Sequence, residues 1–409
     1  MPRALKVAIV GGGVGGLTAA IALRQRVLEV TVYEQTPQLT EIGAGLNLGP
    51  NAMKAFRALG LEQAIAAVGH ESDYQVVRDW RSGRVISRVP RRGYLSRRYG
   101  ATHYTVHRAD LQQVLSGALP EGSLRLGARC VGVETDDSSA CAQFADGSSV
   151  EADVVVGADG IHSVVRESLF GAEAPHFTGL SCWRGLVPLD SLPEGLIGPD
   201  GTTWLGPRGH VVHYLVRRGE LVNFVAHYET DAWTEESWTR ECDRSELIET
   251  FRGWHDTLLR LFDSSERYYR WALYDRDPLG SWSRGRATLL GDSAHAMLPY
   301  LGQGACMAIE DGCILAATLA GMPEDPGRAL KLYERVRLPR ARGAVLGSRA
   351  RARVNHLTSP WRRLTRDIGM GLAQRFGKDR TAMQSSWLFD YDIGQEMQAL
   401  GAGGAAARA

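Results

Sequence analysis

Residues 5–35 carry the pattern of a strand, a glycine-rich turn, a helix and a second strand. The run KVAIV, residues 6–10, is almost entirely apolar, which is typical of a parallel strand buried on both faces. GGGVGG follows it, then the apolar helical stretch LTAAIALRQ, and then the strand EVTVYE, which ends at Glu34. The pattern predicts a βαβ unit here and a further helix over residues 49–59.

The segments 74–89 and 176–230 have a different pattern, in which apolar and polar residues alternate between turns. RVISRV, HVVHYLV and LVNFVAHY are examples, and this period of two predicts antiparallel strands. Between these segments, and again after Asp275, the chain returns to a strand-and-helix pattern. We therefore expect two interleaved domains rather than two consecutive ones, followed by a largely helical region from Ala329 to Leu400.

The glycine-rich turn of the βαβ unit has the spacing Gly11-x-Gly13-x-x-Gly16, and Glu34 ends the following strand. Glycines permit a tight turn and let backbone N–H groups approach a pyrophosphate at the helix N-terminus. A carboxylate about 20 residues further on accepts hydrogen bonds from ribose hydroxyls. The acid favours an adenosine ribose without a 2′-phosphate, so the pattern predicts NAD or FAD.

A second glycine-containing loop lies far along the chain, in TLLGDSAHAMLPYLGQGACMAIEDG, Thr288 to Gly312. It has no Walker lysine, and no second ligand accompanies His295 at metal spacing, so we expect a structural histidine and no metal. An NAD dehydrogenase does not need such a loop. FAD is long enough to need one, with its adenosine at the first loop and its ribityl chain and isoalloxazine elsewhere.

The amino-acid composition limits which binding partners and which cellular compartment are expected. The 409 residues include 47 basic and 46 acidic side chains, which argues against nucleic acid as the main partner. The arginine-rich run from Arg335 to Arg353 is interpreted as one exposed helix face. Six scattered cysteines without a CxxC indicate free thiols, and no apolar run approaches the about 20 residues of a membrane span. We expect a cytoplasmic protein, monomeric or homodimeric, that binds no membrane.

Three motifs resemble those of a known family. GADGIHSVVR (157–166) and GDSAHAMLPYLGQGACMAIEDG (291–312) are similar to two motifs of the single-component FAD-dependent aromatic hydroxylases, in which they follow a GxGxxG loop. GAGLNLGPNAMKAFRALGLEQ and YTVHRADL are most similar to 6-hydroxynicotinate 3-monooxygenase and the salicylate hydroxylases. The resemblance covers nearly the whole chain.

The resemblance implies an α/β fold like that of p-hydroxybenzoate hydroxylase. A Rossmann-like FAD-binding domain is interleaved with an antiparallel-sheet substrate domain, and the C-terminal region is helical. We assign residues 1–72, 99–175 and 275–350 to the FAD-binding domain and residues 73–98 and 176–274 to the substrate domain. Residues 351–400 form a helical segment, and residues 401–409, GAGGAAARA, are expected to be a disordered tail.

The resemblance also implies how FAD is held. Asp292 accepts a hydrogen bond from a ribityl hydroxyl, and Arg108 reaches the flavin and the pyrophosphate. Residues 302–305 lead a helix whose N-terminal dipole faces the flavin's pyrimidine edge and stabilises its reduced, anionic form. The full set of expected cofactor-binding residues is Gly11, Gly13, Gly15, Gly16, Glu34, Gln35, Asn47, Arg108, Cys130, Asp159, Asp292, Pro299, Gly302, Gln303, Gly304 and Ala305.

In this family NADH or NADPH visits to reduce FAD, which then takes up O2 as the C4a-hydroperoxide. That species transfers an electrophilic oxygen, so the ring attacked must be electron-rich, and a phenol becomes more so when it is deprotonated. The site therefore needs a base or a hydrogen-bond acceptor near the substrate hydroxyl, and it must keep water away. The implied substrate is a small phenolic or hydroxypyridine carboxylic acid, with loss of CO2 when the attacked carbon bears the carboxyl group.

The strand HVVHYLV supplies the candidate catalytic residues. His210 and Tyr214 share one face of this strand and His213 takes the other. The resemblance implies that His210 transfers a proton or hydrogen-bonds to the substrate, and that Tyr214 makes a hydrogen bond with the substrate; His213 is expected to be structural. Asn47 is a third candidate, although 6-hydroxynicotinate 3-monooxygenase has a histidine there and an asparagine cannot act as a base. Arg81 and Arg184 are the candidate partners of the substrate carboxylate.

Other functions remain open. Para-hydroxylation of the 3-hydroxybenzoate 6-hydroxylase type is one, although those enzymes have glutamine where Pro299 stands. A tailoring hydroxylase of aromatic natural products is another. A halogenase of the same fold would carry a Trp-x-Trp-x-Ile-Pro stretch, and CWRGLVP has a single tryptophan. A non-catalytic flavin-binding sensor would be yellow and yet would not oxidise NADH faster with any aromatic acid.

Overall fold

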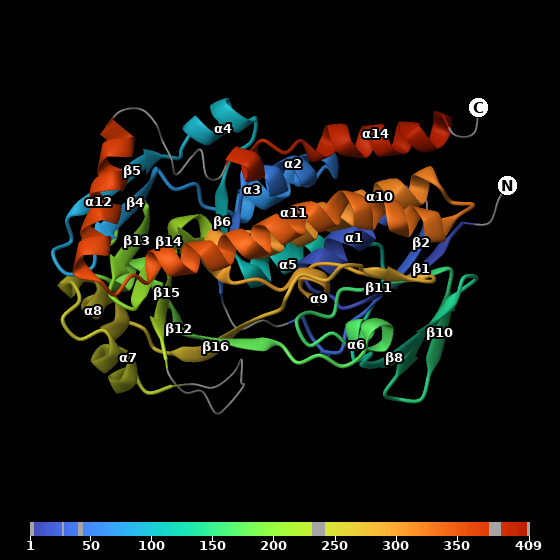
Figure 1. Ribbon diagram of the computed structural model, residues 1–409, viewed down its shortest axis with the longest axis horizontal. Helices are drawn as coiled ribbons and strands as arrows, with labels where there is room; N and C mark the ends of the chain where they lie inside the picture. The colour runs from blue at the N-terminus through green and yellow to red at the C-terminus, as the bar shows by residue number, and fades with distance from the viewer. Residues whose placement is uncertain (1–3, 27, 40–43, 231–241, 376–385, 407–409) are drawn as a thin grey trace.

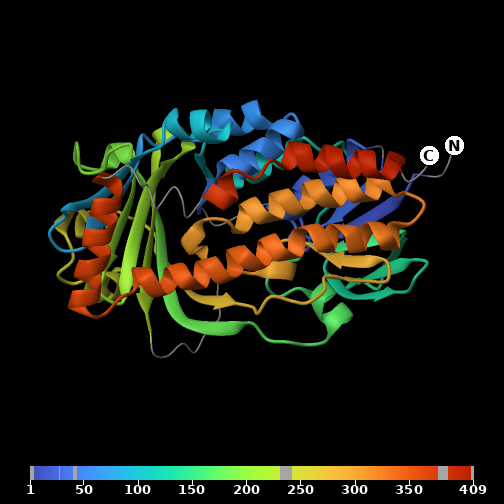
Figure 2. The same cartoon turned by 45° about the horizontal axis from the view of Figure 1, so that its top comes forward.

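A computed structural model describes residues 4–26, 28–39, 44–230, 242–375 and 386–406. Figures 1 and 2 show a glycine-loop sheet at one end of the molecule and a larger sheet at the other. The long helix α11 (Pro326–Asn355) runs along both. The molecule is therefore built around these two sheets, and the candidate site residues lie on the elements between them.

The glycine-loop sheet has six strands and is built on the predicted βαβ unit. Its strands are parallel except for β17, which is antiparallel to β18. Helices α1 (Val14–Arg24) and α10 (Gly304–Gly321) pack against each other beside it. The order of its strands is β17 (Ser283–Arg284), β18 (Ala287–Leu289), β11 (Val154–Gly157), β1 (Lys6–Val10), β2 (Glu29–Tyr33) and β7 (Leu124–Arg125).

Helix α10 (Gly304–Gly321) is the central helix of this half. By length and composition it could cross a membrane, but 83% of that window is buried inside the protein. It contacts α1 (Val14–Arg24), α2 (Pro50–Ala58), α11 and α14 (Ile393–Ala406). A helix that is apolar on all sides is stable in water when other elements cover it in this way.

The larger sheet has seven strands, and neighbouring strands are antiparallel except for the parallel pair β4–β13. One face packs on helices α7 (Arg244–Thr250) and α8 (Asp256–Asp263) through a core that includes Trp183 and Phe251. The other face is directed at the glycine-loop half. The order is β16 (Tyr269–Asp275), β12 (His176–Pro188), β15 (Leu221–Glu229), β14 (Gly209–Val216), β13 (Gly201–Gly206), β4 (Tyr74–Asp79) and β5 (Val85–Pro90).

Smaller elements complete the fold. One sheet joins β8 (Cys130–Thr135), β9 (Ala140–Phe144) and β10 (Ser149–Ala152), and another pairs β3 (Gly45–Leu48) with β6 (Tyr104–His107). Further helices are α3 (Glu62–Val68), α4 (Tyr94–Tyr99), α5 (Arg108–Gly117), α6 (Val164–Phe170), α9 (Asp292–His295) and α12 (Pro360–Arg375), with short 3-10 helices η1 (Leu189–Ser191), η2 (Arg217–Gly219) and η3 (Pro299–Leu301).

The C-terminal region differs from the expectation in one respect. Helix α14 continues to Ala406, so residues 401–406 are helical where the composition predicted a disordered tail. The reason is that alanine is the strongest helix former, and this stretch extends a helix already docked on α10 and α2. Residues 407–409 lie outside the described residues. The domain boundaries given above remain a prediction.

Candidate active site

The first glycine loop is a turn in which backbone atoms stand where side chains would clash. Gly11 has φ of +109°, and a Cβ there would lie 2.3 Å from the carbonyl oxygen of Ala158. A Cβ on Gly16 would lie 2.0 Å from the Gly11 carbonyl oxygen. Around the Cβ position of Gly13, in contrast, there is open space. The loop is therefore tight on its inner side and open at the N-terminus of α1, where a phosphate can approach.

The carboxylate of Glu34 holds this loop in place. One oxygen accepts the Gly12 backbone N–H at 2.6 Å, and the other accepts the Thr36 N–H at 2.9 Å. Gln112 adds a hydrogen bond at 3.0 Å from its amide nitrogen to the Gly12 carbonyl oxygen. The first oxygen keeps a further lone pair for a ribose hydroxyl, whereas the second also accepts from the Thr36 hydroxyl at 3.0 Å. The side chain of Gln35 is exposed.

Gly15 has a packing function in the structure. A Cβ on Gly15 would lie 2.7 Å from a methyl carbon of Leu290 and 3.0 Å from the Cβ of Ala308. The missing side chain therefore lets α1 pack closely against α10, which carries Ala308. This packing brings the first and second glycine loops to the same end of the sheet.

The motif around Asp159 is joined to the second loop by hydrogen bonds. Asp159 accepts from the hydroxyls of Ser163 at 2.5 Å and Ser293 at 3.1 Å, and from the Val165 backbone N–H at 3.1 Å. These bonds stabilise the start of α6 and fix the two loops relative to each other. Cys130 is buried nearby, and burial together with the charge of Asp159 raises the pKa of its thiol. The thiol therefore stays protonated.

The carboxylate of Asp292 is accessible to a ligand. Its side chain is solvent-exposed, and yet surrounding protein atoms desolvate it enough to raise its pKa, against the opposing charges of His295 and Arg108. The two observations agree if the carboxylate faces a water-accessible space walled by protein. A Cβ on Gly304 would lie 4.0 Å from one Asp292 oxygen, with no closer atom. This arrangement fits a ribityl hydroxyl between Asp292 and the start of α10.

The start of α10 presents free backbone N–H groups. Gln303 is the N-cap and makes no side-chain cap hydrogen bond, and the first turn, with Gly304 and Ala305, contains no acidic residue. Just before it, η3 begins at Pro299, and Gly302 has φ of +61°. The uncapped N-terminus of an 18-residue helix attracts negative charge, as the reduced flavin's pyrimidine edge requires.

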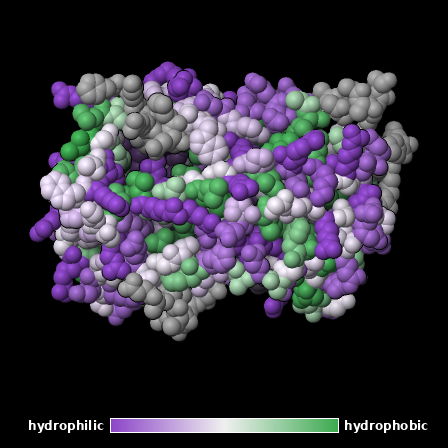
Figure 3. Space-filling view, viewed as in Figure 1, coloured by the Kyte–Doolittle hydropathy of each residue, from purple (hydrophilic) through white to green (hydrophobic). Residues whose placement is uncertain are grey.

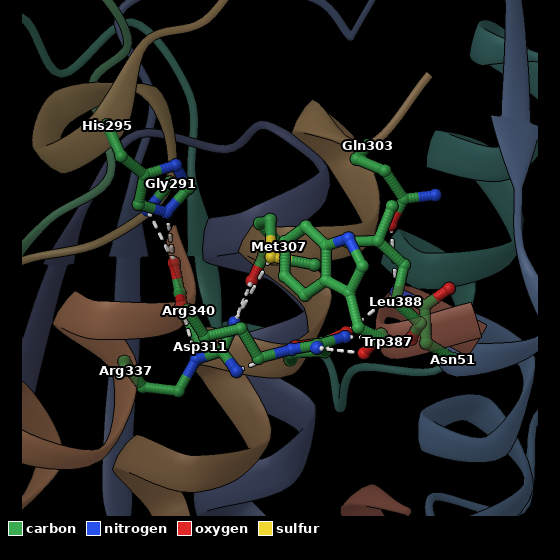
Figure 4. A network of polar contacts seen from close by, with 11 residues as sticks. Asn51, Gly291, His295, Gln303, Met307, Asp311, Arg337, Arg340, Trp387 and Leu388 are labelled. Carbon is green, nitrogen blue, oxygen red and sulfur yellow. Dashed lines mark hydrogen bonds and ion pairs between the residues drawn. The ribbon is translucent and has the colours of Figure 1, made fainter. Parts of the chain in front are cut away.

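A buried network of charges fixes the second loop to α10 and α11 (Figure 4). Asp311 accepts from the Gly291 backbone N–H at 3.1 Å, lies 2.6 Å from the imidazole of His295, and pairs with Arg337 at 2.7 Å. Arg337 also pairs with Glu310 at 2.6 Å. Buried opposite charges lower the carboxyl pKa values of Glu310 and Asp311 against the effect of burial.

His295 is part of this buried network. Its ring contacts Asp311 and Trp282 inside the protein. Among the residues that the structure describes, no group of three or more His, Cys, Asp or Glu side chains is placed to hold a metal ion.

Strand β3 lies between the second loop and the large sheet. The Cys306 thiol of α10 donates to the Asn47 carbonyl oxygen at 3.4 Å, and a Cβ on Gly302 would lie 3.3 Å from the Asn47 Cβ. On the other side, Gly45 donates its N–H to Asn223 at 2.8 Å. A Cβ on Gly45 would lie 2.6 Å from the ring of Tyr214. Asn47 is therefore placed where the predicted flavin and substrate sites meet.

The predicted faces of β14 are confirmed. The ring of His210 stacks on that of His227, with 4.5 Å between ring centroids, and contacts Tyr300 of η3, with 5.0 Å between centroids. Both contacts lie on the face directed at the glycine-loop half. Tyr214 shares this face through its contact with β3, and burial raises its pKa to about 12. His213 lies on the opposite face near Trp204, and burial lowers its pKa to about 3. The catalytic roles of His210, Tyr214 and Asn47 remain predictions.

Sequence reasoning missed three members of this face. His227 could have been found, because the alternation in LVNFVAHY places it with Asn223 on the face that carries His210. Tyr300 and His356 come from η3 and from the end of α11, and no local pattern links them to the sheet. Of the two candidate carboxylate partners, Arg81 is exposed in the turn between β4 and β5, whereas Arg184 lies on β12.

Comparison with known proteins identifies the family. The model of the FAD binding domain family matches residues 4–348. The chain is 40% identical over 387 residues to 3-amino-4-hydroxybenzoate 2-monooxygenase PtnB3 of Streptomyces platensis, covering 95% of this chain and 96% of that protein. It is 35% identical to 6-hydroxynicotinate 3-monooxygenase of Pseudomonas fluorescens over 396 residues, 96% of each chain.

Solved structures agree with this family. HpxO of Klebsiella pneumoniae in complex with FAD and uric acid superposes with a TM-score of 0.83 at 29% identity, covering 93% of this chain and 97% of that one. A salicylate hydroxylase substrate complex superposes with a TM-score of 0.80 at 28% identity, covering 98% of each. FAD is the cofactor, with NAD(P)H and O2 as its co-substrates. The chain belongs to the FAD-dependent aromatic monooxygenases.

Proposed function

We propose that this enzyme hydroxylates a small phenolic carboxylic acid, with an aminohydroxybenzoate as the first candidate. The observation that carries the proposal is the face of the large sheet directed at β3 and η3. There His210 and Tyr214 flank Val212 on β14, and Arg184 of β12 lies in the same row of the sheet, on the far side of Val225. Val212 stays partly accessible in the middle of an otherwise buried strand. A base, a hydroxyl donor and a cation around an apolar floor suit a flat ring with a hydroxyl and a carboxylate.

Arg184 is the proposed carboxylate partner. Its guanidinium carbon lies 4.4 Å from the centroid of the Trp271 ring. Its charge acts to lower the pKa values of Tyr214 and His227, so it lies near both side chains. Within the described part of the chain, Arg184 makes no ion pair, and its Nε atom is buried without a hydrogen-bond partner. A half-buried cation without a counter-ion is compensated when an anionic ligand binds.

His210 and Tyr214 are proposed to handle the substrate hydroxyl. Burial lowers the pKa of His210 well below its usual value, and the neighbouring His227 and His356 lower it further. The imidazole is therefore neutral near pH 7 and can accept a proton. Tyr214 keeps its proton, because burial raises its pKa to about 12, and it can donate a hydrogen bond. Bound FAD supplies the activation of O2, and these side chains orient and ionise the ring that receives the oxygen.

Asn47 favours the aminohydroxybenzoate over 6-hydroxynicotinate. An amide at this position can orient a substrate but cannot take its proton. The 40% identity to a 3-amino-4-hydroxybenzoate 2-monooxygenase supports the same choice. Decarboxylative hydroxylation of a hydroxypyridine carboxylate is the second candidate, supported by the 35% identity to 6-hydroxynicotinate 3-monooxygenase. A cytoplasmic location and a monomeric or homodimeric state are part of the proposal.

The experiment is a substrate screen with the purified flavoprotein. Aminohydroxybenzoates, hydroxybenzoates, salicylates and hydroxynicotinates are each added with NADH or NADPH, and reductant, O2 and product are measured together. The proposal expects one acid to accelerate reductant oxidation and to appear as a product with one more oxygen. Loss of CO2 would identify the second candidate. A yellow protein that no aromatic acid stimulates would instead be a sensor.

A further inference from the structure

His210 is joined to a second histidine that leads away from the sheet. Its Nδ1 atom lies 2.8 Å from the Nε2 atom of His356, and both side chains are buried, with exposed fractions of 2% and 5%. Two ring nitrogens at this distance require one N–H donor and one lone-pair acceptor. The pair is therefore a neutral hydrogen-bonded unit through which a proton can pass.

The far side of His356 approaches the surface. Its Nδ1 atom is buried without a hydrogen-bond partner and lies 3.9 Å from a carboxylate oxygen of Glu229. That distance is too long for a hydrogen bond, and a small side-chain rotation that shortens it by about 1 Å makes one. Glu229 is 35% exposed at its side chain, and Arg208 lies 3.5 Å from its other oxygen. Glu229 and His356 both line a surface cavity of about 420 Å³.

The groups around His210 disfavour its protonated, positively charged form. From the sheet His227 stacks on its ring, from η3 Tyr300 contacts its edge, and from helices α11 and α12 the charges of Arg351 and Arg366 act on it. Burial and these charges lower the pKa of His210, and burial lowers the pKa of His356 to about 4. A proton that enters the pair is released again to a better acceptor.

We propose that His356 and Glu229 carry the hydroxyl proton of the substrate from His210 to the surface cavity. This inference rests on the proposed function, because it needs a substrate hydroxyl at His210. The O–H bond of the substrate breaks, and its proton goes to Nε2 of His210. The proton on Nδ1 of His210 goes to Nε2 of His356, and the proton on Nδ1 of His356 goes to the Glu229 carboxylate. The products are a phenolate, two tautomerised neutral imidazoles and a carboxylic acid that loses its proton to solvent.

The side chains of His356 and Glu229 are positioning residues in this scheme, since neither touches the ring that reacts. A purely structural role for His356 is the alternative, because it packs between Tyr300 and His210. The two roles differ in their effect on proton movement. Packing does not set the rate at which a bound phenol ionises, whereas a relay does.

The test uses stopped-flow mixing of the FAD-loaded enzyme with its phenolic acid, without NAD(P)H. Phenolate absorbance and a pH-indicator dye report ionisation and proton release, and a separate titration gives Kd. His356→Gln and Glu229→Gln should slow both signals by about 100-fold, within the range of a lost acid–base group, while Kd stays within a few-fold. Glu220→Gln is the matched control, because Glu220 is an exposed acid directly before β15 and should behave like wild type.

Chemical rescue separates the relay from packing. In His356→Ala, added imidazole can enter through the adjoining cavity of about 420 Å³ and should restore proton release in proportion to its free-base form. A wild-type rate in either glutamine variant would overturn the proposal, as would a slow His356→Ala variant that imidazole does not rescue. If no phenolic acid binds or is hydroxylated by the wild-type enzyme, the proposed function fails instead, so the two failures are distinguishable.

Discussion

The guanidinium of Arg337 lies between two consecutive carboxylates of α10, 2.6 Å from Glu310 and 2.7 Å from Asp311. All three side chains are fully buried. Asp311 also binds the Gly291 backbone and His295, so this ion-pair group connects α11 to the loop that carries Asp292. One buried cation therefore fixes the position of the loop at which the flavin chain is expected.

Replacing Arg337 should destabilise the protein strongly. Arg337→Leu leaves Glu310 and Asp311 buried and less well compensated, and breaking a buried pair in this way costs about 3–5 kcal/mol. Denaturant unfolding of the FAD-free protein measures this loss. Arg335→Leu is the control, because Arg335 is exposed on the same helix. Equal stability of the two variants would show that the buried group contributes little.

Removing the charge of Glu34 should weaken FAD binding. Glu34 accepts the Gly12 and Thr36 N–H groups on separate carboxylate oxygens, and in Glu34→Gln the amide can accept only one of them because its nitrogen only donates. We expect the Kd for FAD to rise about 10-fold, which corresponds to ~1.4 kcal/mol, a typical net value for such a hydrogen bond. Quenching of flavin fluorescence gives the Kd. Glu29→Gln should not change the Kd, because Glu29 is an exposed acid at the start of β2.

Arg184 should matter only for substrates that carry a carboxylate. Arg184→Gln should raise the KM of the acid by about 10- to 100-fold, as expected for a hydrogen bond between charged groups of ~1.5–3 kcal/mol. The matching phenol without a carboxyl group should be used equally by both proteins. Arg81→Gln is the control, since Arg81 is exposed in a turn. A KM that rises equally for acid and phenol would remove Arg184 from carboxylate recognition.

His210 should govern the pH dependence of hydroxylation. Its lowered pKa keeps the imidazole neutral, so the wild-type enzyme retains its base as the pH falls through 6.5 and loses it only well below that value. In His210→Asn the substrate must ionise by its own acidity, with a phenol pKa of about 10. Product formation should then be low at pH 7 and rise with pH, while FAD remains bound. An unchanged profile of rate against pH would exclude His210 as the base.

Local chemistry explains which parts of the fold were accessible from the sequence. The βαβ unit and the loop residues Gly11, Gly16 and Glu34 follow from glycine sterics and short spacing. In the structure the Glu34 carboxylate binds the turn that contains Gly11 and Gly16. Period-two alternation likewise gave the shared face of His210 and Tyr214. Such patterns depend on residues only a few positions apart, so they can be recognised without knowledge of the tertiary structure.

Long-range packing explains which contacts could not be predicted from the sequence. His210 and His356 are 146 residues apart, and Arg337 is 26 residues from Asp311, so no periodicity relates them. The parallel pairing of β4 with β13 depends on how two distant segments add to one sheet. The exposed apolar stripe of α12, with Trp361, Leu364, Ile368 and Leu372, is visible over that helix at the left of Figure 3, and nothing in the structure shows what covers it.

The central claim is coupled hydroxylation of an aromatic acid, and one stoichiometry tests it most directly. NAD(P)H oxidised, O2 consumed, hydroxylated product and H2O2 are quantified in a single reaction with an aminohydroxybenzoate and its analogues. We predict that at least one acid accelerates NAD(P)H oxidation and yields product in step with O2, with little H2O2. Formation of H2O2 alone with every phenolic acid would contradict the account.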